Sequence, residues 1–119
     1  MESKQLLGAW GEVQAVDHLR KKGYAILACN YRCRLGEIDI IARRRGIIAF
    51  VEVKRRSSTA YGQPAEAVNL QKQARIAQAA ALYMQENELD DANIRFDIIE
   101  ILPGEIRHIE GAFDATNQF

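Results

Sequence analysis

Apolar and polar residues alternate most clearly between Gly36 and Arg56, where the chain reads GEIDIIARRRGIIAFVEVKRR. Two apolar runs flank Arg45-Gly46, and glycine tolerates the positive φ that a two-residue hairpin loop requires. The pattern therefore predicts a β-hairpin in which the numbers of paired residues sum to 91.

Four charged residues occupy positions in this hairpin where a soluble hairpin would normally carry Ile or Val: Glu37, Asp39, Glu52 and Lys54. The predicted register places Asp39 opposite Glu52 and Glu37 opposite Lys54, so that one face gathers three carboxylates and an ammonium. The opposite faces of both strands are just as apolar, which is typical of strands covered on both sides in an α/β protein.

A carboxylate buried without compensation costs several kcal/mol, so these acids are expected either to pair with cations or to hold a metal. Two or three carboxylates provide the oxygen ligands that Mg²⁺ or Mn²⁺ prefers, and no Cys or His lies nearby to suggest zinc. We favour the metal, with an ion-pair network as the alternative. Lys54 would then serve as a point charge for a phosphate or a metal-bound water.

The remaining pattern predicts two long helices and three further strands around the hairpin. The expected elements are a helix at about Ser3–Lys22, a strand at Tyr24–Tyr31, a helix at Ala65–Glu86, a strand at Asn93–Leu102 and a short strand at Ile106–Glu110 after the turn Pro103-Gly104. Gly111–Phe119 is expected to form a partly ordered tail. Residues 1–119 are expected to form a single domain, with a core at about 3–113.

Composition agrees with a globular protein, because 48% of the 119 residues are hydrophobic and 27% are charged. The net charge is zero, but residues 32–56 hold eight basic side chains against three acidic ones. Such a basic rim around carboxylates is expected of a protein that handles phosphates with a metal. A solvated charge run would explain Arg43–Arg45 equally well. The sequence shows no apolar segment that suggests a signal peptide or a membrane span, so we expect a cytoplasmic location.

Glu12 is a further candidate, because the first predicted helix offers it only Ala15 and Val16 at the positions three and four residues on. A helix carboxylate without a local basic partner suggests a site residue. An exposed glutamate at the flank of a helix explains the same pattern about as well.

The segments GEIDIIA and FVEVKRR resemble the YraN-like family of predicted bacterial endonucleases. That family is similar to archaeal Holliday junction resolvases and belongs to the PD-(D/E)XK nuclease superfamily. Ile38-Asp39 stands where the superfamily has "PD", and Glu52-Val53-Lys54 stands as "(D/E)XK".

The resemblance covers nearly everything from Leu7 to Phe113, including the segment RFD at Arg95–Asp97. It departs at Arg43–Arg45, where relatives tend to carry a polar or acidic turn. That departure bears on how a substrate would be held, not on the acids.

The resemblance implies a restriction-endonuclease-like α/β fold, a mixed central sheet flanked by helices in the order α-β-β-β-α-β-β. It implies a metal-dependent DNA endonuclease, acting on branched or other non-B structures. Asp39 and Glu52 would bind Mg²⁺ or Mn²⁺ with Glu12 as a further ligand, Lys54 would orient the attacking water, and Glu37 would hold Lys54 or water. By analogy with resolvases, a homodimer would cut two strands.

Six residues are candidates for holding the nucleic-acid backbone: Arg32, Arg34, Arg55, Arg56, Gln63 and Lys72. The arginines surround the acids in the sequence, Gln63 and Lys72 stand near the start of the second long helix, and the family has a lysine at the place of Lys72. Two alternatives stay open: a nucleic-acid-binding module of the same fold that has lost turnover, and a scaffold in which the carboxylates merely pair with arginines.

Overall fold

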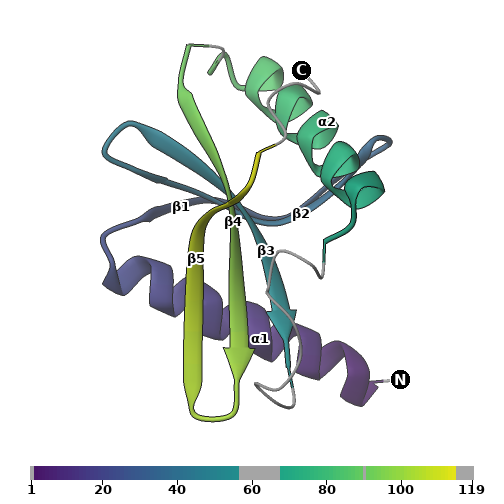
Figure 1. The fold of residues 1–119 in the computed structure, drawn as a ribbon, viewed down its shortest axis with the longest axis vertical. Coiled ribbons are helices and arrows are strands. Elements are labelled where there is room, and N and C mark those ends of the chain that lie inside the picture. Colours follow the sequence, from purple (N-terminus) through teal and green to yellow (C-terminus); the bar gives the residue numbers. More distant parts are fainter. Residues whose placement is uncertain (1, 57–67, 90, 115–119) are drawn as a thin grey trace.

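The computed structural model describes residues 2–56, 68–89 and 91–114, with side chains from residue 11 onward (Figure 1). Two helices and five strands follow one another in the predicted order α-β-β-β-α-β-β, which confirms the predicted fold class. The elements are α1 (Glu2–Lys21), β1 (Ala25–Cys33), β2 (Gly36–Arg44), β3 (Ile47–Arg55), α2 (Leu70–Glu86), β4 (Asn93–Leu102) and β5 (Glu105–Phe113).

The strands form one mixed sheet in the order β1-β2-β3-β4-β5. Neighbouring strands are antiparallel except β3 and β4, which are parallel. Parallel neighbours need a crossover connection, and the segment that contains α2 provides it. The hairpin of β4 and β5 closes one edge of the sheet, as its alternation predicted.

The helices cover opposite faces of the sheet, so the prediction that both faces are buried is confirmed (Figure 1). Ala15 and Leu19 of α1 pack on one face with residues such as Ile40, and α2 packs on the other through Ile76 and Tyr83. Neither helix of the described chain is long and apolar enough to span a membrane.

Ile38 differs from the predicted pattern, which placed it on the same face as Ile40. It lies instead in the cluster under α2, whereas Ile40 lies under α1. Asn30 stands between the β1 partners of these two residues and adopts a left-handed φ of 54°. The alternation of faces therefore changes at this point, and Asp39, between the two isoleucines, lies at the change.

The predicted turn at Arg45-Gly46 is confirmed, since both residues have positive φ, 52° and 78°, as a type I′ loop requires. The predicted start of α2 at Ala65 is wrong. Residues 65–67 lie outside the described residues, and the helix begins at Leu70 because the Asn69 side chain caps it by accepting from the Lys72 N–H at 2.8 Å.

The predicted tail begins too early, because β5 continues through Gly111 to Phe113. The ring of Phe113 stacks on that of Phe96, with 5.3 Å between the centroids. This contact buries part of an aromatic side chain against the core under α2, which explains why the strand runs three residues past Glu110.

Candidate active site

The central hairpin has the predicted register, but only over part of its length. Pairs run from Arg44 and Ile47 at the turn to Ile40 and Val51, and each sums to 91. Beyond Val51, β3 continues beside β4, while the first half of β2 continues beside β1. The strands β2 and β3 therefore part at Asp39, and the predicted facing pairs of Asp39 with Glu52 and of Glu37 with Lys54 are wrong.

Asp39 occupies the place where the two strands part. Its Oδ2 accepts a hydrogen bond from the backbone N–H of Val53 at 2.7 Å, which satisfies a donor that the hairpin ladder leaves without a partner. Burial, followed by the charges of Glu52 and Glu12, raises the pKa of Asp39 from 3.8 to about 6. The Val53 N–H and Lys72 oppose this rise only in part. Ionising Asp39 is therefore costly in this protein without a further cation.

Glu52 is buried at the end of the apolar part of β3 and meets two ammonium groups. Lys72 of α2 donates to Glu52 Oε1 at 2.7 Å, and Lys54 Nζ lies 3.5 Å from the same oxygen. Burial, followed by the contact with Lys72, lowers the pKa of the Lys54 ammonium. The structure thus brings together Glu52, Lys54 and Lys72 from two elements that are distant in the sequence.

Glu12 lies on the same side as these acids, since its charge contributes to the raised pKa of Asp39. Its carboxylate accepts a hydrogen bond from Asn30 Nδ2 at 2.8 Å. Glu37 does not join the group. It is largely exposed and forms an ion pair of 3.4 Å with Arg32, so the expectation that it would hold Lys54 is wrong.

The predicted phosphate-binding arginines divide between two places. Arg32 and Arg34 line a cavity at the tip of the β1–β2 hairpin. Arg56 instead lies 3.3 Å from the buried carboxylate of Glu100, and the side chain of Arg55 passes close to Gly11 of α1. Gln63 lies outside the described residues.

Glu100 is a buried acid that the sequence reading missed. It lies beside Lys54 in the parallel register of β3 and β4, and it also approaches Arg107 at 3.8 Å. The signal was present in the sequence, because Phe96 and Ile98 precede Glu100 on the same face of an alternating strand. Like Glu52, Glu100 is an acid on an otherwise apolar face of a strand, so the same pattern could have marked it as a buried acid.

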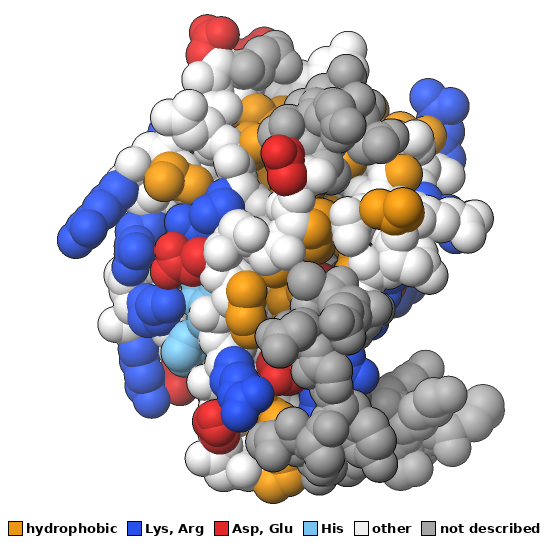
Figure 2. Space-filling model, viewed as in Figure 1, with side chains coloured by type: hydrophobic (Ala, Val, Ile, Leu, Met, Phe, Trp, Pro, Cys, Tyr) orange, Lys and Arg blue, Asp and Glu red, His pale blue; other side chains and the backbone are white. Residues whose placement is uncertain are grey.

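Asp97 is a further buried acid, and its surroundings differ from those of Asp39. Arg95 donates to both of its oxygens at 2.8 Å, the Nε2 of His108 lies 2.8 Å away, and the Gly111 N–H donates at 3.0 Å. Burial alone would raise the pKa of Asp97, but these hydrogen bonds outweigh burial and hold the pKa below its usual value. Figure 2 shows basic, acidic and histidine side chains side by side on one flank of the molecule.

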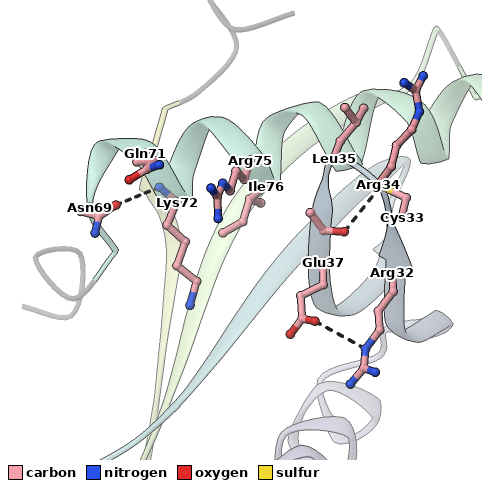
Figure 3. A pocket seen from close by; sticks show the side chains of 11 residues that line it. Arg32, Cys33, Arg34, Leu35, Glu37, Asn69, Gln71, Lys72, Arg75 and Ile76 are labelled. Atoms are coloured by element: carbon pink, nitrogen blue, oxygen red, sulfur yellow. Dashed lines mark hydrogen bonds and ion pairs between the residues drawn. The ribbon is translucent and has the colours of Figure 1, made fainter.

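A cavity of about 780 Å³ lies between the tip of the β1–β2 hairpin and the first half of α2 (Figure 3). Its polar lining comes mainly from Arg32, Arg34, Asn69, Gln71, Lys72 and Arg75. Lys72 belongs both to this cavity and to the contact with Glu52, so the cavity opens beside the acids. Arg75 and Asn69 were not among the sequence candidates.

The donor set fits a hard divalent cation, although no group of three or more Asp, Glu, His or Cys side chains is arranged to hold one in the described part of the chain. Asp39 and Glu52 are two carboxylates, and Mg²⁺ commonly uses only one or two together with water. Within the described residues no hydrogen bond reaches Asp39 Oδ1 or Glu52 Oε2. The ammonium of Lys72 already fills the role of a cation beside Glu52.

Comparison with known proteins identifies the family. The model of "Uncharacterised protein family UPF0102" matches residues 11–101. A UPF0102 protein of Lachnoclostridium phytofermentans is 48% identical over 114 residues, covering 95% of this chain and 97% of the relative. One from Alkaliphilus oremlandii is 53% identical over 113 residues, covering 90% and 97%. The solved structure of SSO0001 aligns with a TM-score of 0.44 at 18% identity, over 97% of this chain and 56% of that one. The chain belongs to the UPF0102 family.

Proposed function

We propose that this protein is a metal-dependent endonuclease that hydrolyses phosphodiester bonds in DNA. The observation that carries the proposal is the pair Asp39 and Glu52 at the point where β2 and β3 part, with Lys54 beside them. A carboxylate whose pKa is raised by burial and by neighbouring acids is a poor structural element and a suitable metal ligand. The resemblance of GEIDIIA and FVEVKRR to PD-(D/E)XK nucleases supports the same chemistry.

Asp39 and Glu52 would hold Mg²⁺ or Mn²⁺, which supplies a Lewis acid and a nucleophilic water when bound. The hydrogen bond from Val53 fixes one oxygen of Asp39 and leaves the other for the cation. Lys54, held beside Glu52, would orient the attacking water or neutralise charge that develops on the phosphate. Glu12 would act from α1 as an outer ligand, and Asn30 orients its carboxylate.

Branched or other non-B DNA is the proposed substrate class. Cutting two strands of such a DNA needs two sites, so we infer that a homodimer acts on it. The second candidate function is a nucleic-acid-binding module that keeps the fold without turnover. The contact of Lys72 with Glu52 favours this candidate, because an internal cation already neutralises one of the two acids.

Incubation of the pure protein with plasmid, single-stranded, flap and four-way DNA tests the proposal. Cleavage of at least one substrate is expected with Mg²⁺ or Mn²⁺ and not with EDTA. Glu52→Gln should abolish the cleavage, whereas Asp17→Asn, in an exposed ion pair with Lys21, should not. Binding without cleavage under every metal condition would favour the silent module, and equal cleavage in EDTA would remove the metal from the proposal.

A further inference from the structure

The cavity between the β1–β2 hairpin and α2 has walls that contact each other directly. A Cβ at Gly36 would lie 2.9 Å from the backbone oxygen of Arg75, so the hairpin tip approaches the helix as closely as a glycine allows. Further along, the Tyr31 hydroxyl donates to Glu86 at 2.7 Å, and its ring packs on Tyr83. The cavity is therefore formed before any ligand arrives.

Two of the four cations that line this cavity lack a neutralising partner among the described residues. The side chains of Arg34 and Arg75 form no ion pair or hydrogen bond with any residue in the described ranges, whereas Arg32 is paired with Glu37 and Lys72 with Glu52. The first turn of α2 also carries no acidic residue. Two unpaired guanidinium groups beside a helix start with no acid create a positive potential, which an anion would stabilise.

These groups lie along a path that begins at the acids. In Figure 3 Lys72 and Arg75 follow each other along α2, and Arg34 extends from the hairpin beside the same helix. Lys72 also contacts Glu52, so the path runs from the acid site past Arg75 to Arg34. Regularly spaced anions on a chain would suit it better than one isolated anion.

The size and lining of the cavity restrict the ligand further. About 780 Å³ is the volume of a site for a small ligand, which accommodates one or two nucleotides of a single strand but not a duplex. No aromatic side chain is among the described residues that line it. Bases would therefore find no stacking platform, and the contacts would be to phosphate, without sequence selectivity.

We propose that this cavity is the subsite for the phosphodiester backbone of an unpaired DNA strand, held by Arg75 and Arg34 next to the acid site. The assignment rests on the proposed nuclease function for its place in the reaction. It deepens that function, because a substrate must then present an unpaired segment beside the bond that is cut.

Binding without metal tests the subsite separately from cleavage. Labelled single-stranded DNA, the duplex of the same sequence and the matching RNA are titrated in EDTA at several salt concentrations. The variant Arg34→Gln/Arg75→Gln should bind the single strand at least about tenfold more weakly. The slope of log K against log salt should fall by about 0.7 for each cation removed.

The matched control is Arg20→Gln/Lys21→Gln, which removes the same charge from exposed positions at the end of α1, outside the cavity. It should leave the affinity and the salt slope unchanged. Arg34 and Arg75 lie on the surface and form no ion pair within the described residues, and the control loses only the exposed pair of Lys21 with Asp17, so both variants should melt close to the wild-type temperature.

The outcomes separate the subsite from the function. An equal loss in both double variants, or no loss, overturns the subsite even if metal-dependent cleavage persists. Loss confined to Arg34→Gln/Arg75→Gln without cleavage in any metal retains the subsite and overturns the hydrolysis. If the duplex binds as tightly as the single strand, the preference for an unpaired strand is wrong. If RNA binds more tightly than DNA, the assignment of DNA as the substrate is wrong. Displacement by inorganic phosphate at the concentration of strand phosphate would reveal a site for an isolated anion instead.

Discussion

Asp39 and Asp97 are aspartates on strands of the same sheet, and their surroundings shift their pKa values in opposite directions. Asp97 is fully buried and accepts hydrogen bonds from Arg95, His108 and Gly111. Asp39 has one backbone donor, from Val53, and faces the charges of other acids. Burial acts in the same direction on both, so the partners decide the difference.

This difference separates a structural acid from a candidate functional one. The partners of Asp97 are complete in the protein itself, because a bidentate arginine, a histidine and a backbone N–H account for both oxygens. The environment of Asp39 favours the protonated form until something positive is added. An ionised carboxylate at this position lowers the stability of the fold, so the aspartate is better explained by a function than by the fold. Binding of a cation is such a function.

Removing the charge of Asp97 should have the largest effect. Asp97→Asn removes the fully buried charge that binds the partly buried guanidinium of Arg95, which then keeps only the Glu110 carboxylate, at 3.2 Å, as an ion-pair partner among the described residues, so the free energy of unfolding should fall by about 3 to 5 kcal/mol. Urea unfolding measures the loss. The control Asp17→Asn breaks an exposed ion pair with Lys21 and should cost less than about 1 kcal/mol. Similar small losses in both variants would contradict the structural role of Asp97.

The matching change at Asp39 should have the opposite sign at neutral pH. Its pKa is about 6 in the folded protein and 3.8 in the unfolded chain, so the folded state binds more protons between these values. Wild-type stability from this group is therefore greatest below about pH 4 and falls as the pH rises to about 6, by about 3 kcal/mol at most.

Asp39→Asn removes that dependence and keeps an oxygen for the Val53 N–H. The variant should be more stable than the wild type at pH 8, with the advantage shrinking toward zero by about pH 4. Urea unfolding at several pH values measures the difference. A loss of about 3 to 5 kcal/mol at pH 8 would mean that Asp39 anchors a cation, as the ion-pair alternative requires.

The next effect is on activity, and in free energy it should be somewhat smaller than these changes in stability. Replacing Asp39, Glu52 or Lys54 with Ala should each lower metal-dependent DNA cleavage by at least about a hundredfold, which is about 2.7 kcal/mol, since each removes a charge that the transition state requires. Rates are compared under single-turnover conditions on folded protein. Asp17→Asn is the control, and cleavage that survives all three changes would place the active site elsewhere.

Of the two acids, the sequence pattern marked Asp39 as a candidate site residue but did not reveal the structural role of Asp97. Asp39 stood out because it interrupts an apolar alternation that is otherwise covered on both faces, and the turn at Arg45-Gly46 fixed the register near it. Asp97 was marked only by the resemblance at RFD. Its partner His108 lies on another strand, β5, and the contacts between β4 and β5 depend on a bulge between Phe96 and Ile98 that the alternation does not reveal.

The splitting of β2 from β3 at Asp39 could not be derived from period-two alternation. It depends on Asn30 adopting a left-handed conformation on β1 and on β3 finding a parallel partner in β4. Lys72 and Arg75 likewise meet the hairpin only through the crossover of α2 onto the same face. Local pattern therefore predicted the elements and the acids, while the cavity arises from contacts between distant segments.

The smallest expected effect is the response to metal, and it tests the comparison most directly. A ligand that binds only the folded state stabilises it by RT ln(1 + [L]/Kd), about 1.4 kcal/mol at tenfold above Kd. Mg²⁺ or Mn²⁺ should therefore raise the melting temperature of the wild type relative to EDTA. Asp39→Asn should lose most of that gain, because it lacks the carboxylate that would bind the metal. Without metal it should still be the more stable protein, because the repulsion between Asp39 and the neighbouring acids is gone.

The control in the same melts is Lys72→Met. This change removes the cation that competes for Glu52, so it should lower stability in EDTA and increase the gain from metal. A wild type that is indifferent to both metals, together with a strongly destabilised Asp39→Asn, would place Asp39 in the same class as Asp97. The acids of the hairpin would then be structural, and the nuclease proposal would fall with them.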